Sequence, residues 1–288
     1  MKFAVTGGDI RAVKLCGLLK RKGHTVSACA LGDGEDIRAF TAETPEAAVE
    51  NADCIVLPLP VSKGEGLLYA PLDGRAVSVG RILSAARRDA VLFAGMPDCN
   101  TRALAEEKGL ILVDYAAREE FAVENACATA EGAVQVLLTE LPTILCGKRC
   151  LVVGYGRIGK LIARKLSALG VFVTVSARRA SDIALIRAFG YDAADTRALA
   201  GTLDGYDMIV NTVPAPVLDE ALLREVKRDC FCLDLASSPY GIDREVAEKL
   251  GLRAMLAPGL PARTAPLTAA EAIRNTIYNV LAERGVTV

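Results

Sequence analysis

The 288-residue chain has no tryptophan, and aromatic residues make up only 5% of it. This scarcity argues against aromatic platforms for stacking single-stranded nucleic acids and against aromatic sugar-binding clefts. Lysine and arginine number 34 against 35 acidic residues, a formal net charge of -1, so no overall field attracts nucleic acid or an anionic membrane. No apolar run approaches the roughly 18 residues of a membrane helix. We therefore expect neither nucleic acid nor membrane as a partner.

Histidine is almost missing as well. His24 is the only one, in the turn between the first predicted helix and the second strand, where we expect a surface residue. Without a second histidine, a histidine-based proton relay of the hydroxyacid-dehydrogenase kind is not available. The chain also has no G-x-S-x-G elbow and no P-loop lysine motif, which argues against the usual hydrolases and kinases.

Export signals and metal motifs are not found in the sequence. The opening MKFAVTGGD reaches glycines and an acid too early for a signal peptide. The nine cysteines are scattered, and their two close pairs, Cys146 with Cys150 and Cys230 with Cys232, have no matching ligand pair at zinc-site spacing. We therefore expect a cytoplasmic protein with reduced thiols packed as small core residues, and no metal site.

Short apolar strands alternate with helical patterns, which predicts an α/β fold with parallel sheets covered on both faces. In the first part, the expected strands are Lys2–Thr6, Thr25–Ala30, Cys54–Leu59, Ala90–Ala94 and Leu110–Val113. In the second part, they are Cys150–Val153, Val171–Ser176, Met208–Asn211, Phe231–Leu235 and Leu252–Leu256. Thr44 and Pro45 predict a helix start, Gly170, Gly190 and Gly251 predict helix ends, and a helix is expected over Leu218–Val226. Two helical patterns lie outside these series, one over Asn125–Leu138 and a final one over Ala265–Arg284.

This order predicts two Rossmann-like parallel-sheet domains with a cleft between them, which is the usual place for a ligand. The first, residues 1–123, is the expected substrate domain, and the C-terminal helix, residues 265–288, returns to it. The second, residues 124–264, is the expected dinucleotide-binding domain and includes the connecting helix.

The strongest local motif is G-x-G-x-x-G at Gly154, Gly156 and Gly159, between an apolar strand and an amphipathic helix. In this context, the first glycine permits a tight turn, the second lets the backbone approach a pyrophosphate, and the third lets helix and strand pack closely. Arg157 and Ile158 lie at the helix start, whose free amides favour phosphates. The motif therefore predicts dinucleotide binding.

The end of the following strand indicates which dinucleotide is bound. An NAD site has an Asp or Glu there for the ribose 2′-hydroxyl, but this chain has Ser176, then Arg178 and Arg179. A hydroxyl beside two guanidinium groups suits a 2′-phosphate, because arginine offers planar paired donors. NADP(H) is favoured, and NAD(H) stays open because the arginines also read as a solvated helix start.

Polar residues follow the next two apolar strands. Asn211, Thr212, Val213 and Pro214 end one of them, and Asp234 with Ala236 ends the other. Carboxyl ends of parallel strands face the cofactor crevice in this fold, so we expect these residues at the ribose and nicotinamide side. Ordinary turns remain the alternative.

Three further loops carry groups that suit anions. Gly8 and Arg11 follow the first strand, Ser62 and Lys63 follow the third, and Arg263 and Thr264 lie in a proline-stiffened loop, Pro258–Thr264. A glycine turn at a helix start and paired guanidinium donors both bind carboxylates. We expect these three loops to share a substrate site, although each alone is more often structural.

Together with these motifs, the chain resembles a known family, that of the dipicolinate synthase A subunit. The resemblance covers essentially the whole chain and rests on GGDIR, LPVSKG, ENACATAEGAV, VVGYGRIGK, NTVPAPVL, DLASSPYGID and APGLPARTAP, which occur in the family's order. It implies an NAD(P)-dependent oxidoreductase of the mother cell of sporulating bacteria, which makes pyridine-2,6-dicarboxylate from a lysine-pathway precursor. The implied partner is the flavoprotein-like B subunit of dipicolinate synthase, and a homo-oligomer is left open.

The implied reaction oxidises a cyclic dihydropyridine dicarboxylate, with Arg11, Ser62, Lys63, Arg263 and Thr264 as candidate carboxylate ligands. Asp9 and Glu131 are the candidate catalytic residues, chosen by position to accept the ring proton. The alternatives are an alanine-dehydrogenase-like imino or hydroxy-acid oxidoreductase and a non-catalytic NADP-sensing regulatory subunit.

The chain departs from the family pattern at two positions. Ala128 stands where a proline is typical, and Tyr240 stands where a glycine is common. Both changes affect loop stiffness more than chemistry, and they leave open a paralogue with another substrate.

Overall fold

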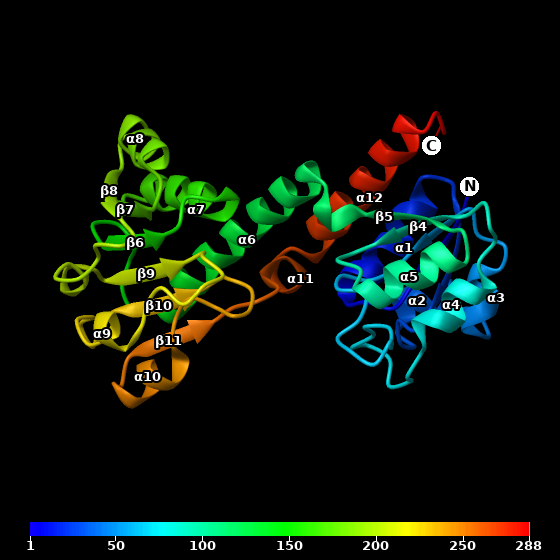
Figure 1. Cartoon of the computed structure of the whole chain (residues 1–288), viewed down its shortest axis with the longest axis horizontal. Helices are drawn as coiled ribbons and strands as arrows, with labels where there is room; N and C mark the ends of the chain where they lie inside the picture. Colours follow the sequence, from blue (N-terminus) through cyan, green and yellow to red (C-terminus); the bar gives the residue numbers. More distant parts are fainter. Residues whose placement is uncertain (288) are drawn as a thin grey trace. The chain divides into compact units, whose positions relative to one another are not determined.

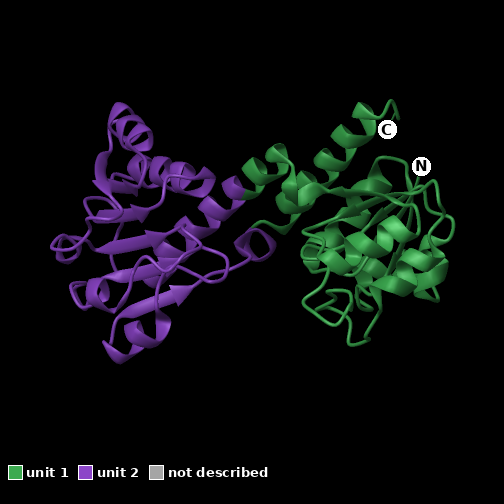
Figure 2. Ribbon diagram, in the orientation of Figure 1, with its two compact units in different colours: residues 1–125, 265–288 green, residues 126–264 purple. Residues whose placement is uncertain are grey.

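The computed structural model describes residues 1–287, whose strands form a five-stranded and a six-stranded parallel sheet (Figure 1). The prediction of two parallel-sheet α/β domains is confirmed. The chain divides into two compact units (Figure 2), Met1–Asn125 together with the segment from Ala265 onward, and Ala126–Thr264. The boundary at residue 125 falls inside one helix, α6 (Glu119–Glu140). Residue 288, the last of the predicted returning segment, lies outside the described residues.

The first unit holds a sheet of order β2-β1-β3-β4-β5. Its strands are β1 (Lys2–Thr6), β2 (Thr25–Cys29), β3 (Cys54–Val56), β4 (Val91–Ala94) and β5 (Ile111–Asp114). Its helices are α1 (Ile10–Arg21), α2 (Glu35–Arg38), α3 (Pro45–Val49), α4 (Val79–Ala85), α5 (Cys99–Glu107), the 3-10 turn η1 (Tyr115–Ala117) and α12 (Pro266–Glu283). β3 is shorter than predicted because Pro58 and Pro60 cannot donate to a sheet ladder.

The second unit holds a sheet of order β11-β10-β9-β6-β7-β8. Its strands are β6 (Arg149–Val153), β7 (Phe172–Ala177), β8 (Asp192–Asp195), β9 (Met208–Asn211), β10 (Phe231–Asp234) and β11 (Arg253–Leu256). Its helices are most of α6, then α7 (Arg157–Ala168), α8 (Ala180–Ala188), the 3-10 turn η2 (Leu203–Gly205), α9 (Glu220–Leu223), α10 (Arg244–Lys249) and α11 (Leu260–Thr264).

β8 corrects the expected five-strand series of the second unit. Its sequence is Asp-Ala-Ala-Asp, and its residues are exposed or half-buried at the sheet edge beside β7. An edge strand has a solvated side and needs no continuous apolar run, so the hydrophobic pattern did not reveal it.

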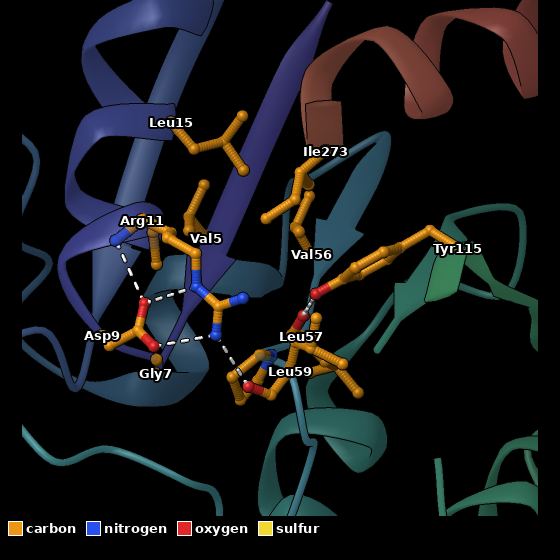
Figure 3. A pocket seen from close by; sticks show the side chains of 13 residues that line it. Val5, Gly7, Asp9, Arg11, Leu15, Val56, Leu57, Leu59, Tyr115 and Ile273 are labelled. Carbon is orange, nitrogen blue, oxygen red and sulfur yellow. Dashed lines mark hydrogen bonds and ion pairs between the residues drawn. The ribbon is translucent and has the colours of Figure 1, made fainter. Parts of the chain in front are cut away.

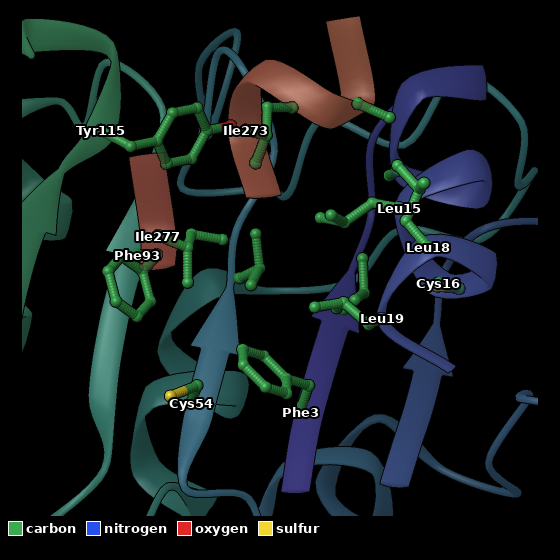
Figure 4. Packing of buried hydrophobic residues seen from close by; sticks show 14 of the residues in the cluster. Phe3, Leu15, Cys16, Leu18, Leu19, Cys54, Phe93, Tyr115, Ile273 and Ile277 are labelled. Atoms are coloured by element: carbon green, nitrogen blue, oxygen red, sulfur yellow. The ribbon is translucent and has the colours of Figure 1, made fainter. Parts of the chain in front are cut away.

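The last helix, α12, packs with α1 in the first unit, as predicted for the returning segment. Leu15 of α1 and Ile273 of α12 point toward one another over the sheet (Figure 3). Figure 4 shows the same core from another side, where Ile277 of α12 lies with Phe3 of β1 and Leu19 of α1. The first unit therefore buries apolar side chains from both ends of the chain.

Several local predictions are confirmed. Thr44 caps α3 by accepting a 3.1 Å hydrogen bond from the amide of Ala47, and Pro45 takes the first helical position. Gly170, Gly190 and Gly251 have φ angles of +78°, +83° and +69°, the left-handed conformation of glycines that end helices.

Other local predictions are wrong. The segment Pro258–Thr264 is not simply a loop, because Leu260–Thr264 forms α11. The predicted helix over Leu218–Val226 is reduced to the short α9. His24 is buried rather than on the surface, because its ring packs against Phe3 and bonds Tyr278.

Candidate functional site

The three glycines of the fingerprint have distinct spatial roles. Gly154 has φ +100°, a conformation that side chains disfavour, and its added Cβ would lie 2.6 Å from Thr212 Oγ1. An added Cβ on Gly156 would meet nothing within 4 Å, so it would project into open space. On Gly159 it would lie 2.1 Å from the carbonyl oxygen of Gly154. The turn, the open approach and the close helix packing expected of a dinucleotide site are therefore all present.

A cleft of about 660 Å³ opens beside this turn, at the carboxyl ends of the strands of the second unit. That volume lies within the range of small-molecule sites, roughly 300–1,000 Å³. Its walls come from the glycine turn, from the segments after β7 and β8, and from the loop after β9. They comprise Gly154, Tyr155, Gly156, Ala177, Arg178, Arg179, Asp182, Thr196, Arg197, Thr212, Val213, Pro214, Ala215, Pro216 and Val217.

The predicted phosphate-binding residues divide into lining and hidden ones. Arg178 and Arg179 line the cleft, whereas Ser176 is fully buried and its hydroxyl accepts a 3.1 Å hydrogen bond from Thr196 Oγ1. Arg179 donates to Asp182 at 3.0 Å, but Arg178 has no ion pair within residues 1–287. Arg178 is therefore the uncompensated charge of this wall.

Two residues predicted for the cofactor site, Arg157 and Ile158, follow the glycine turn. Arg157 is exposed at the start of α7, and Ile158 is half-buried against the apolar core of the second unit. Neither side chain belongs to the lining of the cleft. What this segment offers a phosphate is backbone amides at the start of a twelve-residue helix.

The residues predicted after β9 and β10 form a buried network. Asp234, 2% exposed, accepts four hydrogen bonds, from Asn211 Nδ2 (2.8 Å) and from the amides of Ala236 (3.0 Å), Gly241 (2.8 Å) and Ile242 (2.9 Å). Asn211 also exchanges hydrogen bonds with the backbone of Val213. Asn211 and Asp234 thus fasten the loops behind the cleft, while Thr212, Val213 and Pro214 line it.

In the first unit, Asp9 and Arg11 form an ion pair instead of two separate binding groups. Asp9 caps α1, and its carboxylate accepts 2.8 Å hydrogen bonds from Arg11 Nε and Nη2 (Figure 3). Arg11 Nη2 also donates to the carbonyl of Leu59 at 3.1 Å. The neighbouring carboxylate keeps the pKa of Arg11 above its ordinary value despite burial. Asp9 therefore orients Arg11.

A small cavity of about 20 Å³ lies beside this pair and is also lined by Gly8 and Tyr115. Its volume holds a water, not a pyridine ring. Tyr115 was not singled out in the sequence; its hydroxyl donates to the carbonyl of Leu57 at 3.3 Å, and burial raises its pKa. Its position just after β5 was the signal that could have marked it.

The remaining predicted residues are on the surface or engaged locally. The Ser62 hydroxyl bonds within its own turn to Gly64, and Lys63 Nζ lies 4.2 Å from the centre of the Tyr69 ring. Glu131, with a 65% exposed side chain, pairs with Lys165 of α7 at 2.8 Å.

Arg263 and Thr264 belong to α11 in the second unit. Arg263 is exposed, and the Thr264 hydroxyl donates to the carbonyl of Leu260 at 2.9 Å. An added Cβ on Gly132 of α6 would lie 2.7 Å from Thr264 Oγ1, so this glycine permits the close approach of α11. The common site for the three loops stays a prediction.

Two features are absent from residues 1–287. No group of three or more His, Cys, Asp or Glu side chains is arranged there to hold a metal ion. No helix in that range combines the length and apolarity that crossing a membrane requires.

Comparison with known proteins agrees with this geometry. Residues 2–116 match the N-terminal domain of the dipicolinate synthase A subunit, and residues 142–241 match a putative NAD(P)-binding domain. The chain is 30% identical over 286 residues to the dipicolinate synthase A subunit of Bacillus subtilis (strain 168), covering 98% of this chain and 96% of the relative.

Solved structures give the same result. The crystal structure of the dipicolinate synthase A subunit from Bacillus halodurans is 27% identical with a TM-score of 0.88, covering 98% of this chain and 97% of that one. The Bacillus subtilis protein is 29% identical with a TM-score of 0.86, covering 98% and 96%. A transhydrogenase from Sinorhizobium meliloti, 18% identical with a TM-score of 0.70, covers 98% and 94% and shares the fold. The chain belongs to the dipicolinate synthase A-subunit family and carries an NAD(P)-binding domain in its second unit.

Proposed function

We propose that this chain is the dehydrogenase subunit of a dipicolinate synthase, which uses NADP⁺ to oxidise a dihydrodipicolinate-level precursor of the lysine pathway. The product is pyridine-2,6-dicarboxylate, and a role in spore formation goes with it. The observation that carries the proposal is the cleft at Gly154–Gly156, in a chain similar to a dipicolinate synthase A subunit over nearly its whole length. Ring aromatisation favours hydride loss, so the protein mainly has to bind and orient the ring.

Preference for NADP(H) over NAD(H) is supported by the charges of the cleft wall. Ala177 is the last residue of β7 and Arg178 follows it, at the place where NAD enzymes have a carboxylate for the ribose 2′-hydroxyl. Asp182 is the acid nearest in sequence, and Arg179 already engages it at 3.0 Å. A 2′-phosphate brings about two negative charges to Arg178, which has no ion pair in the described part of the chain.

The cleft residues suit a dinucleotide in shape as well. The open space at Gly156 admits a pyrophosphate to the amides of the glycine turn, and Thr212, Val213 and Pro214 line the same cleft. Thr212 is fixed there because its hydroxyl donates to the carbonyl of Val153 at 2.9 Å. The bound cofactor supplies the hydride acceptor.

Arg11 and Arg263 are our candidates for the substrate carboxylates. The guanidinium of Arg11 has a fixed orientation because Asp9 and the Leu59 carbonyl accept hydrogen bonds along one of its edges. Arg263 is exposed at the end of α11. Of the two residues predicted to accept the ring proton, Asp9 is better suited to positioning Arg11, and Glu131 is paired with Lys165.

The name of the relatives, A subunits of a synthase, supports a second subunit as the partner. We propose that a B subunit of dipicolinate synthase works with this chain. Its contribution is tested together with the reaction.

The reaction is tested by following NADPH formation at 340 nm with dihydrodipicolinate, generated in situ, and purified full-length chain, with and without the B subunit. We expect reduction that depends on both the cofactor and the substrate, and dipicolinate as product by chromatography. Nucleotide binding without turnover in either mixture would contradict the enzymatic assignment and favour a sensing role.

A further inference from the structure

One way of holding an arginine recurs in this chain. In residues 1–287, an aspartate binds the arginine two positions later through the same three contacts at three places. The aspartate Oδ1 accepts from the arginine backbone amide and Nε, and Oδ2 accepts from Nη2. The pairs are Asp9–Arg11, Asp73–Arg75 and Asp195–Arg197. The spacing in sequence alone does not produce this arrangement, because Asp36 also has an arginine two positions later but pairs with Lys14.

The contacts in the Asp195–Arg197 pair fix one edge of the guanidinium. The amide and Nε of Arg197 lie 2.9 and 3.0 Å from Asp195 Oδ1, and Nη2 lies 2.7 Å from Oδ2. A guanidinium has five N–H donors, and Asp195 takes two. The side chain of Arg197 is 69% exposed and has no other partner in the described part of the chain. Three oriented donors therefore remain for a ligand.

These donors lie in the wall of the dinucleotide cleft. Thr196 and Arg197 line it together with Arg178 and Gly156. Thr196 and Arg197 follow the edge strand β8, which pairs with β7 so that Asp195 lies beside Ala177.

Two hydrogen bonds continue this pairing past the ends of the strands. The amide of Thr196 donates to the carbonyl of Ala177 at 3.1 Å, and its hydroxyl donates to Ser176 Oγ at 3.1 Å. Arg178 and Arg197 therefore come from the ends of neighbouring strands, at the place where this fold reads the ribose 2′ substituent.

We infer that Arg197, oriented by Asp195, is a second binding residue for the adenosine 2′-phosphate, beside Arg178. The inference rests on the proposed use of NADP(H) and names the specificity residue of that cofactor site. NAD sites have a carboxylate here that accepts from the ribose hydroxyls, but the carboxylates of Asp182 and Asp195 are engaged by arginines. A phosphate presents acceptors only, which suits the donors left on Arg197.

The test is calorimetric titration of the full-length chain with 2′,5′-ADP and with 5′-AMP, which differ in the 2′-phosphate. Arg197→Ala should weaken 2′,5′-ADP about tenfold, and 5′-AMP less than twofold, because a partly exposed charge-assisted contact lies at the lower end of its range. Arg75→Ala, which removes the matched arginine of the Asp73–Arg75 pair in the first unit, should change neither. Arg197→Lys keeps the charge without the fork and should recover only part of the affinity.

The outcomes separate the inference from the proposed function. Equal losses of affinity for 2′,5′-ADP and 5′-AMP in Arg197→Ala would overturn the inference, because Arg197 would then contact a part that both nucleotides share, such as the adenine. Unchanged binding of 2′,5′-ADP to Arg197→Ala would also overturn it, and full recovery in Arg197→Lys would remove the orienting role of Asp195. If the parent chain does not prefer 2′,5′-ADP, the choice of NADP(H) fails as well. Failure of turnover with dihydrodipicolinate affects only the proposed reaction.

Discussion

His24 and Tyr278 are joined by a 2.8 Å hydrogen bond between Nε2 and the phenolic oxygen, across 254 positions of sequence. His24 is 7% exposed, and its ring centre lies 4.9 Å from that of Phe3. Burial and, to a lesser degree, the positive N-terminus lower the pKa of His24 below its ordinary 6.5. At neutral pH, the folded first unit therefore holds His24 as the neutral imidazole.

This arrangement predicts a loss of stability in mild acid. The unfolded chain binds this proton more readily than the folded one. The contribution of His24 to the free energy of unfolding is therefore complete above about pH 6.5 and is lost as the pH falls through the lowered folded-state pKa. Urea unfolding at about pH 7.5 and about pH 5.5 measures the difference. His24→Gln, which does not titrate, should show a smaller drop than the parent. Equal drops would mean that other groups account for the whole effect.

Substitution of Gly156 should lower nucleotide affinity, whereas substitution of Gly159 should lower stability. Gly156→Val meets open space, so the folded protein should keep its thermal midpoint while nucleotide affinity falls at least a hundredfold, because the side chain occupies the pyrophosphate approach. Gly159→Ala meets the Gly154 carbonyl at 2.1 Å and should cost about 1–3 kcal/mol of stability. Calorimetric titration and thermal unfolding of both variants check this. Undiminished nucleotide binding by a folded Gly156→Val would remove the dinucleotide assignment.

Arg178 should set the preference between NADP(H) and NAD(H). It lines the cleft without an ion pair in residues 1–287, so Arg178→Ala should lower the relative affinity for NADP(H) at least tenfold. Arg179→Ala should have a smaller effect, because Asp182 already neutralises that guanidinium. Arg187→Ala, an exposed arginine of α8 outside the cleft lining, is the control. An unchanged affinity ratio in Arg178→Ala would show that the arginine only begins a helix.

Arg11 is predicted to act on the substrate and not on the cofactor. Arg11→Ala should raise the KM for the dicarboxylate at least tenfold and leave NADP(H) affinity within twofold, because the cofactor cleft belongs to the other unit. It also leaves the Asp9 carboxylate without its partner, at a cost of about 1–3 kcal/mol. Arg75→Ala breaks the corresponding Asp73 pair and serves as the control for such damage. A KM equal to that of Arg75→Ala would place the carboxylate site elsewhere.

Tyr240 occupies a conformation that glycine adopts more easily. Its φ of +66° lies in the left-handed region, which glycine adopts without the steric cost that a side chain brings. Tyr240→Gly should be about 1 kcal/mol more stable than Tyr240→Ala in denaturant unfolding, since both remove the ring and only glycine relieves the strain. Equal stability of the two variants would contradict this account.

The sequence was informative where one residue type has one physical use. The glycines at 154, 156 and 159 and the cap at Thr44 could be assigned because few alternatives meet those backbone demands. The same reasoning failed for β8, where Asp192–Asp195 offers neither apolar alternation nor β-branched residues. Missing that strand also hid Arg197, whose place in the cleft depends on it.

Site residues were harder because one residue type serves several purposes. Asp234 and Asn211 stand at strand ends where ligand-binding groups are expected, yet they bind each other and backbone amides. Asp9 suited a base, yet it holds Arg11. Whether a carboxylate faces a ligand or its own chain depends on a rotamer and on partners distant in sequence, and neither appears in a local pattern.

The return of α12 to the first unit has a consequence for synthesis on the ribosome. Ala270, Ile273, Ile277 and Leu281 of this helix belong to the first core, yet they are translated after the whole of Ala126–Thr264. Chains of several domains ordinarily fold from the N-terminus as they emerge. We therefore expect the apolar face that α12 covers to stay exposed on the nascent N-terminal segment until Ala126–Thr264 has been synthesised. On this expectation, the unit whose translation begins first completes its core last.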